Sequence, residues 1–135
     1  MSYRFLSHTA DVKFRADGSS LEEMFLSAAE ALNETIRGEI TILEQQEKTF
    51  EIEGTDNESL LYNFLEEFLF LLDAEDFLTF SIKSLDINEN KINCTVIGDK
   101  ADHYKFTNDV KAITYSEMFV REKDGGFECQ VVLDV

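Results

Sequence analysis

Apolar and polar residues alternate over several short stretches of the chain, which is the pattern of strands that bury one face. In residues 12–16, for example, Val12, Phe14 and Ala16 share one side. In residues 127–135, the odd-numbered positions face one way and the even-numbered positions face the other. We expect strands at residues 3–6, 12–16, 48–53, 79–87, 91–97, 110–121 and 127–135.

Two longer stretches have apolar residues at intervals of three and four, which predicts amphipathic helices. The first helix is expected to open at Ser19, with Glu22 completing a capping box, and to end at Gly38. The second is expected after Thr55, with Glu58 as its capping partner. Its apolar surface is broad, which indicates that it lies across a sheet.

Short polar segments separate these elements and indicate how the strands connect. Asp17-Gly18 predicts a turn, and Asn88-Glu89-Asn90 and Asp124-Gly125-Gly126 predict hairpins. The polar stretch 99–108 is expected to be a loop. The pattern therefore predicts a single α+β domain over residues 1–135, with a largely antiparallel sheet and two amphipathic helices packed on it.

The net charge of the chain limits the classes of partner that it can bind. The formal net charge is −16, and such a surface repels phosphate backbones and anionic lipids. We expect no direct nucleic-acid binding and no membrane association. Cys94 and Cys129 belong to no C-x-x-C pair and are expected to be buried free thiols, as in a reducing compartment. No signal peptide is recognised at the N-terminus, so the expected location is the cytoplasm.

The residues that could carry chemistry lie near the two ends of the chain. His8-Thr9-Ala10-Asp11 separates the first two expected strands, and Asp134 precedes the terminal Val135. If the first and last strands are neighbours, Asp11, Asp134 and the terminal carboxylate would gather negative charge that a cation could offset. Oxygen ligands of this kind suit calcium, magnesium or manganese.

Ordinary structural roles remain open for these residues. An Asp at a strand end commonly caps the strand or is simply solvated. His8 could be a metal ligand, a base or a packing residue, and Lys111 could be a solvated lysine at a strand start. The sequence has no nucleotide-binding loop, no G-x-S-x-G, no H-E-x-x-H and no recognisable nucleophile context, which argues against an enzyme.

Several segments together resemble one known family, the archeases. The similar segments are YRFLSHTADV at 3–12, SLEEMF at 20–25, SLL at 59–61, FLEEFL at 64–69, DAE at 73–75, VKAITY at 110–115, DGGF at 124–127 and VLDV at 132–135. Each is weak alone, but their order and separations from end to end are jointly specific. The resemblance implies an archease-like single domain.

The resemblance also implies a function. Archeases are non-catalytic cofactors of RtcB-type RNA ligases in tRNA splicing and RNA repair, and they promote the ligase's GTP-dependent guanylylation and multiple turnover. The family's metal site corresponds to Asp11, Asp134 and Val135 here, and its activating lysine to Lys111. One divalent cation is implied, with calcium the ion expected in a structure and magnesium or manganese as alternatives. His8 could support a ligand, and its role stays open.

The chain departs from the family pattern at two places. Many members carry a histidine after VKAITY where this chain has Ser116, and many have a proline in the loop that here spans 101–108 without one. Both changes leave the expected metal ligands in place. Two other functions remain as alternatives: a metal-dependent hydrolase with His8 as base, and a general chaperone or adaptor that uses the apolar second helix as its client surface.

Overall fold

The computed structural model describes residues 1–7, 11–106 and 110–135. The elements of this part of the chain are β1 Ser2–Leu6, β2 Val12–Gly18, α1 Leu21–Arg37, β3 Gln46–Glu53, α2 Asn57–Glu75, β4 Phe77–Asn88, β5 Lys91–Lys100, the 3-10 helix η1 Ala101–His103, β6 Ala112–Lys123 and β7 Gly126–Asp134. Each expected strand and helix is present, with ends shifted by a few residues.

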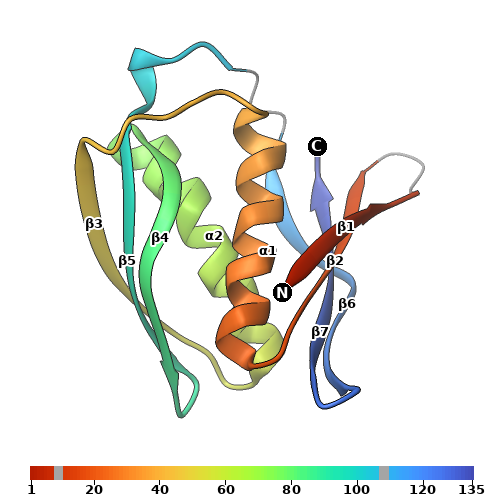
Figure 1. The fold of residues 1–135 in the computed structure, drawn as a ribbon. Helices are drawn as coiled ribbons and strands as arrows, with labels where there is room; N and C mark the ends of the chain where they lie inside the picture. The colour runs from red at the N-terminus through yellow and green to blue at the C-terminus, as the bar shows by residue number, and fades with distance from the viewer. Residues whose placement is uncertain (8–10, 107–109) are drawn as a thin grey trace.

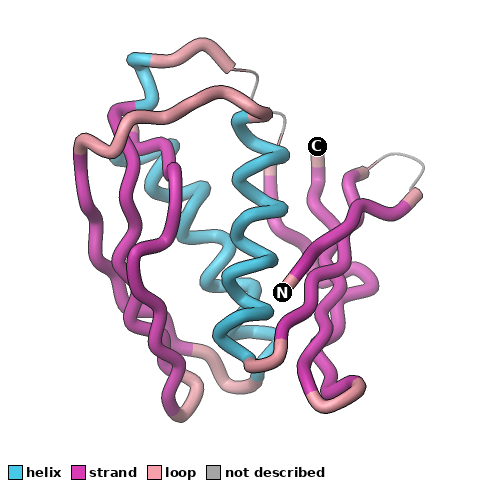
Figure 2. Tube along the Cα trace, viewed as in Figure 1, coloured by secondary structure: helices cyan, strands magenta, loops and turns pink. Residues whose placement is uncertain are grey.

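The strands form two antiparallel sheets with the helices between them (Figures 1 and 2). One sheet has the order β1-β2-β7-β6 and the other the order β3-β5-β4. Helix α1 contacts β2 and β4, while α2 contacts β6 on one side and β3, β4 and β5 on the other. The α+β class is confirmed. The strands divide between two sheets, and each sheet buries its apolar face against the helices.

Helix α1 begins one residue later than its sequence pattern suggested. Ser20 is the N-cap, and its side chain accepts a hydrogen bond from the Glu23 backbone N–H at 3.2 Å. The Glu23 carboxylate reaches back to Ser19 instead, at 2.8 Å from the hydroxyl. The Asp17-Gly18 turn prediction was wrong, since both residues belong to β2. The predicted stop at Gly38 is confirmed by its φ of 68°.

Helix α2 is capped by Asp56 and Ser59, so the expected pair Thr55 and Glu58 was wrong by one position. Aspartate serves this role because its carboxylate accepts a free N–H of the first turn. The helix carries apolar residues around most of its circumference because it is buried between two sheets. Phe64 lies at the centre of the helix and is fully buried. The centroid of its ring is 5.5 Å from that of Phe25 and 5.2 Å from that of Phe68.

Two tight turns close the hairpins that the sequence predicted. Glu89 and Asn90 join β4 to β5 with φ values of 50° and 63°, and Asp124 and Gly125 join β6 to β7 with φ values of 51° and 81°. Positive φ at two consecutive central residues suits the twist of a two-residue hairpin. The expected loop 99–108 is shorter than predicted, because β5 continues to Lys100 and η1 follows it.

The N-terminal and C-terminal parts of the chain meet in the four-stranded sheet. Strand β2 pairs with β7 from Val12 opposite Leu133 to Gly18 opposite Phe127. The C-terminus therefore lies beside the start of β2 (Figure 1). This pairing brings Asp11 and Asp134 to the same end of the sheet. Among the described residues, no helix is long and apolar enough to cross a bilayer.

Candidate functional site

Asp11 and Asp134 are brought to the same end of the four-stranded sheet by the pairing of β2 with β7. Val12 lies opposite Leu133, and Asp11 and Asp134 are the next residues beyond this pair. Leu133 is fully buried on the helix side. Because side chains alternate along a strand, Asp134 points to the outer side, and it is exposed. Asp11 is half-buried.

Lys111 and Val135 lie at this same end. The backbone N–H of Lys111 donates to the carbonyl of Asp134 at 2.7 Å, and Ala112 pairs with Asp134 across β6 and β7. The side chain of Val135 packs against the core, which holds the terminal carboxylate near the sheet. The structure thus brings together Asp11, Asp134, Lys111 and Val135. His8 lies outside the described residues.

A shallow hollow of about 360 Å³ adjoins this end of the sheet and is lined in part by Asp11 and by Glu34 of α1. Asp11 therefore borders space that a small ligand can enter. Within residues 1–7, 11–106 and 110–135, no three His, Cys, Asp or Glu side chains form a ready metal-binding group. A cation held here would use two aspartates, with the terminal carboxylate or solvent completing its oxygen ligands.

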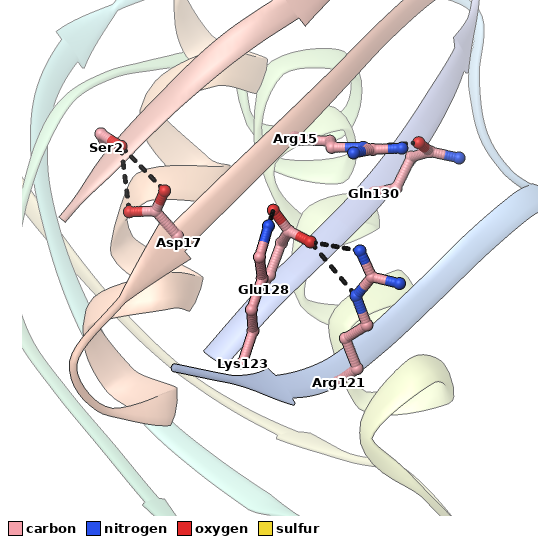
Figure 3. A network of polar contacts seen from close by, with 7 residues as sticks. All are labelled: Ser2, Arg15, Asp17, Arg121, Lys123, Glu128 and Gln130. Carbon is pink, nitrogen blue, oxygen red and sulfur yellow. Dashed lines mark hydrogen bonds and ion pairs between the residues drawn. The ribbon is translucent and has the colours of Figure 1, made fainter. Parts of the chain in front are cut away.

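The outer side of the same sheet carries a polar network that the sequence reasoning missed (Figure 3). Arg121 donates to one oxygen of Glu128 from Nε at 3.2 Å and from a terminal nitrogen at 2.7 Å, and Lys123 lies 3.4 Å from the other oxygen. Arg15 Nε donates to the Gln130 side-chain oxygen at 2.9 Å. No described helix or sheet covers this side. Glu128 and Gln130 are nevertheless buried, because the long side chains of Arg15, Arg121 and Lys123 lie over them.

The charge of Glu128 is stabilised by its neighbours. Burial raises the pKa of Glu128, but the hydrogen bonds from Arg121 and Lys123 and the positive charges of these two side chains together lower it by more, so its pKa lies below the ordinary value. Glu128 is therefore ionised under neutral conditions and ties β6 to β7. The alternation of Lys13, Arg15, Arg121 and Lys123 along outward positions of an otherwise acidic chain was a sequence signal that could have found this face.

The chain is similar in sequence to a known protein family. The chain matches the model of the Archease protein family (MTH1598/TM1083) over residues 3–135. The chain belongs to the archease family. It is 39% identical over 134 residues to Protein archease of Pyrococcus abyssi, covering 95% of this chain and 94% of that protein. It is 38% identical over 146 residues to Protein archease-like of Drosophila melanogaster, covering 100% and 91%.

Solved structures agree with this membership. The solution structure of Methanobacterium thermoautotrophicum protein 1598 matches with a TM-score of 0.83 and 33% identity, covering 98% of each chain. The crystal structure of a Thermotoga maritima archease, described as a possible chaperone, matches with a TM-score of 0.67 and 20% identity, covering 96% and 94%. At 20% identity that second match shows the fold alone. The archease resemblance that the sequence segments suggested is confirmed.

Ser116, at the position where the family resemblance led us to expect a histidine, lies in an irregular part of β6. The β6–β7 register shifts between Thr114 and Phe119, and Glu117 in this bulge has a φ of 55°. Ser116 is exposed, and its backbone N–H lies 3.3 Å from the Thr114 hydroxyl. Just before it, Tyr115 stacks on Tyr62 of α2 with ring centroids 4.3 Å apart. The bulge thus places this position on the surface beside α2.

Proposed function

We propose that this chain is a metal-binding accessory protein that activates an RtcB-type RNA ligase in tRNA splicing and RNA repair. It acts by promoting the ligase's GTP-dependent guanylylation and its multiple turnover. Membership of the archease family supports this proposal. The observation that carries it is the meeting of Asp11, Asp134, Lys111 and the chain terminus at one end of the four-stranded sheet.

The geometry fits a weakly enclosed cation site. Asp11 and Asp134 supply hard oxygen donors from two adjacent strands, and the terminal carboxylate follows Asp134 directly. Asp134 is exposed, so the site opens toward a partner rather than into the core. Calcium is the ion we expect, with magnesium or manganese as alternatives. When bound, a divalent cation would offset negative charge on phosphate groups during nucleotidyl transfer.

The chain's own residues would then have separate tasks. Asp11 and Asp134 hold the cation on the rim of the sheet. Lys111 is exposed, and its backbone N–H bonds to the Asp134 carbonyl, so its side chain starts from the same end of the sheet as the aspartates. A lysine amine in that position would contact the ligase or the phosphates of its nucleotide.

The chaperone alternative was suggested by the apolar surface of α2, and most of that surface is buried. Most apolar residues of α2 are buried between the two sheets, including Leu61, Phe64 and Leu65, none of which has exposed area, whereas Phe70 is exposed. The buried residues are not available to unfolded clients while the protein is folded. A chaperone activity would therefore need another surface, and it predicts no dependence on Asp134.

The deciding experiment is multiple-turnover RNA ligation by an RtcB-type ligase with GTP and manganese, with and without this protein. We expect stimulation by the wild type and its loss in Asp134→Asn. The matched control is Asp124→Asn, because Asp124 is an exposed aspartate at the opposite end of the same sheet. Asparagine tolerates the positive φ at that position.

A second readout addresses the cation without the ligase. Calcium should raise the thermal unfolding temperature of the wild type and of Asp124→Asn, but not that of Asp134→Asn. If all three proteins respond equally, Asp134 is not a ligand. If the wild type fails to stimulate the ligase at all, the proposed function is wrong.

A further inference from the structure

Two arginines face each other on the outer side of the four-stranded sheet. Arg4 of β1 is directly opposite Arg15 of β2, and Arg15 is opposite Gln130 of β7, which is in turn opposite Phe119 of β6. We call these four residues the arginine row. Like charges directly opposite each other in a sheet are destabilising. Among the described residues, no carboxylate lies within ion-pair distance of Arg4 or Arg15.

The neighbouring rows of this face carry further cations, each of them paired with a glutamate. Lys13 of β2 and Arg121 of β6 also occupy outward positions, and Lys123 joins Arg121 at the hairpin end. Five of the twelve cationic side chains of this chain therefore lie on a single sheet face, although its acidic residues number 28. Lys13 is paired with Glu117, and Arg121 and Lys123 are paired with Glu128, so the positive charge that no described carboxylate offsets on this face is that of Arg4 and Arg15. Two such arginines side by side are expected where an anionic partner binds.

The centre of the face has the composition of a protein interface. Phe119 lies beneath the guanidinium of Arg121 at 4.3 Å and near that of Arg15 at 5.6 Å, measured to the ring centroid. Arginine and aromatic residues are the side chains that most often anchor protein–protein contacts. These stacked guanidiniums keep outward N–H groups while their flat faces rest on the ring.

A phosphate backbone is the less favoured occupant. The guanidinium of Arg121 could bind a phosphate through two N–H groups, but Nε and one terminal nitrogen already donate to one oxygen of Glu128. The net charge of −16 would also repel a long polyanion beyond this face. A folded partner that offers only a local patch of carboxylates avoids this long-range repulsion, because charges farther away than about 8 Å are screened at physiological salt.

We propose that the arginine row is the centre of a docking surface for a carboxylate-bearing patch on a partner protein. The identification of that partner as the RNA ligase rests on the function proposed above. Asp134 lies on the same side of this sheet, two positions along β7 beyond Val132, and Asp11 lies at the same end. Docking on the arginine row therefore brings the aspartate end of the sheet against the same partner.

The test is the dissociation constant between this protein and the ligase, measured by calorimetry at two salt concentrations. The charge-reversed pair is Arg4→Glu with Arg15→Glu. The matched control is Lys83→Glu with Lys91→Glu, which changes the net charge equally on two exposed lysines of the other sheet. We expect the arginine pair to weaken binding by about tenfold or more and to reduce its salt dependence, with little change in the control. The milder Arg4→Ala, at an exposed position, serves if the reversed pair does not fold.

Each result has a distinct meaning. Equal binding by wild type and the arginine variants overturns the docking surface and leaves the activating function in place, provided the wild type still stimulates ligation. Binding that depends on the arginine row without stimulation supports the docking surface and overturns the activating function. Tight binding of single-stranded RNA by the protein alone, lost in the arginine variants, overturns the assignment to a protein partner.

Discussion

The backbone N–H of Lys111 donates to the carbonyl oxygen of Asp134 at 2.7 Å. This bond joins the start of β6 to the end of β7 without using either side chain. The Lys111 amine and the Asp134 carboxylate are therefore both left outside the hydrogen bond that positions them. Removing the lysine side chain should separate a role in activation from a role in folding.

We expect Lys111→Ala to abolish or strongly reduce stimulation of the ligase while changing the free energy of unfolding by less than about 0.5 kcal/mol, as for other exposed substitutions. Stimulated ligation and urea unfolding measure the two effects. Lys105→Ala, at another exposed lysine, should affect neither. Full stimulation by Lys111→Ala would remove this residue from the proposed mechanism.

Phe64 should be the most costly residue of α2 to truncate. It is fully buried and contacts the rings of Phe25, Phe50 and Phe68, so it links both helices to the three-stranded sheet. Phe64→Ala should lower the free energy of unfolding by about 3–5 kcal/mol. Phe70→Ala on the same helix, at a position 51% exposed, should cost much less. Similar losses from both in urea unfolding would contradict the observed packing of α2.

Stability should fall in acid partly through Asp99. The Tyr104 hydroxyl donates to this buried carboxylate at 2.7 Å and is the main cause that holds its pKa below the ordinary value of 3.8. A carboxyl whose folded pKa is depressed stabilises the protein above its unfolded pKa, and that contribution is lost as the pH drops toward the folded pKa. Asp99→Asn should therefore be less stable than wild type near neutrality.

The pH profile distinguishes this effect from a general loss of stability. Urea unfolding at about pH 6 and about pH 3 should show a smaller decline for Asp99→Asn than for wild type. The neighbouring exposed Asp102, changed to Asn, should retain the wild-type decline. Parallel profiles for wild type and Asp99→Asn would show that Asp99 does not contribute to the acid dependence.

Both cysteines should be unreactive in the folded protein. Cys94 and Cys129 are buried and free, and burial raises the pKa of each thiol to about 12. Because the thiolate is the nucleophile, a disulfide reagent at about pH 8 should label neither until the protein unfolds. Labelling of both in denaturant is the positive control. Rapid labelling of native protein would mean that one thiol is accessible.

The helix starts show the limit of local sequence rules. Ser19 with Glu22 and Thr55 with Glu58 both satisfy the spacing of a capping box, but the structure uses Ser20 and the pair Asp56 and Ser59. Adjacent polar residues offer several caps of similar energy. The choice among them depends on how the apolar face of each helix must turn to meet the sheets, which is a property of the packed structure.

The chain's own order of residues determined its strands, its two helices, its hairpin turns and its likeness to archeases, because hydrophobic period, glycine turns and motif spacing are local. The tertiary structure decided which strands, helices and side chains lie beside one another. The division into two sheets and the burial of α2 on both sides follow from contacts between separate segments of the chain, and the meeting of Asp11 with Asp134 follows from the β2–β7 pairing of residues more than a hundred positions apart. The outward alignment of Arg4 with Arg15 likewise depends on register. A shift of one residue would turn every side chain to the other face, and only the packed core selects the register that buries Phe14 and Leu133.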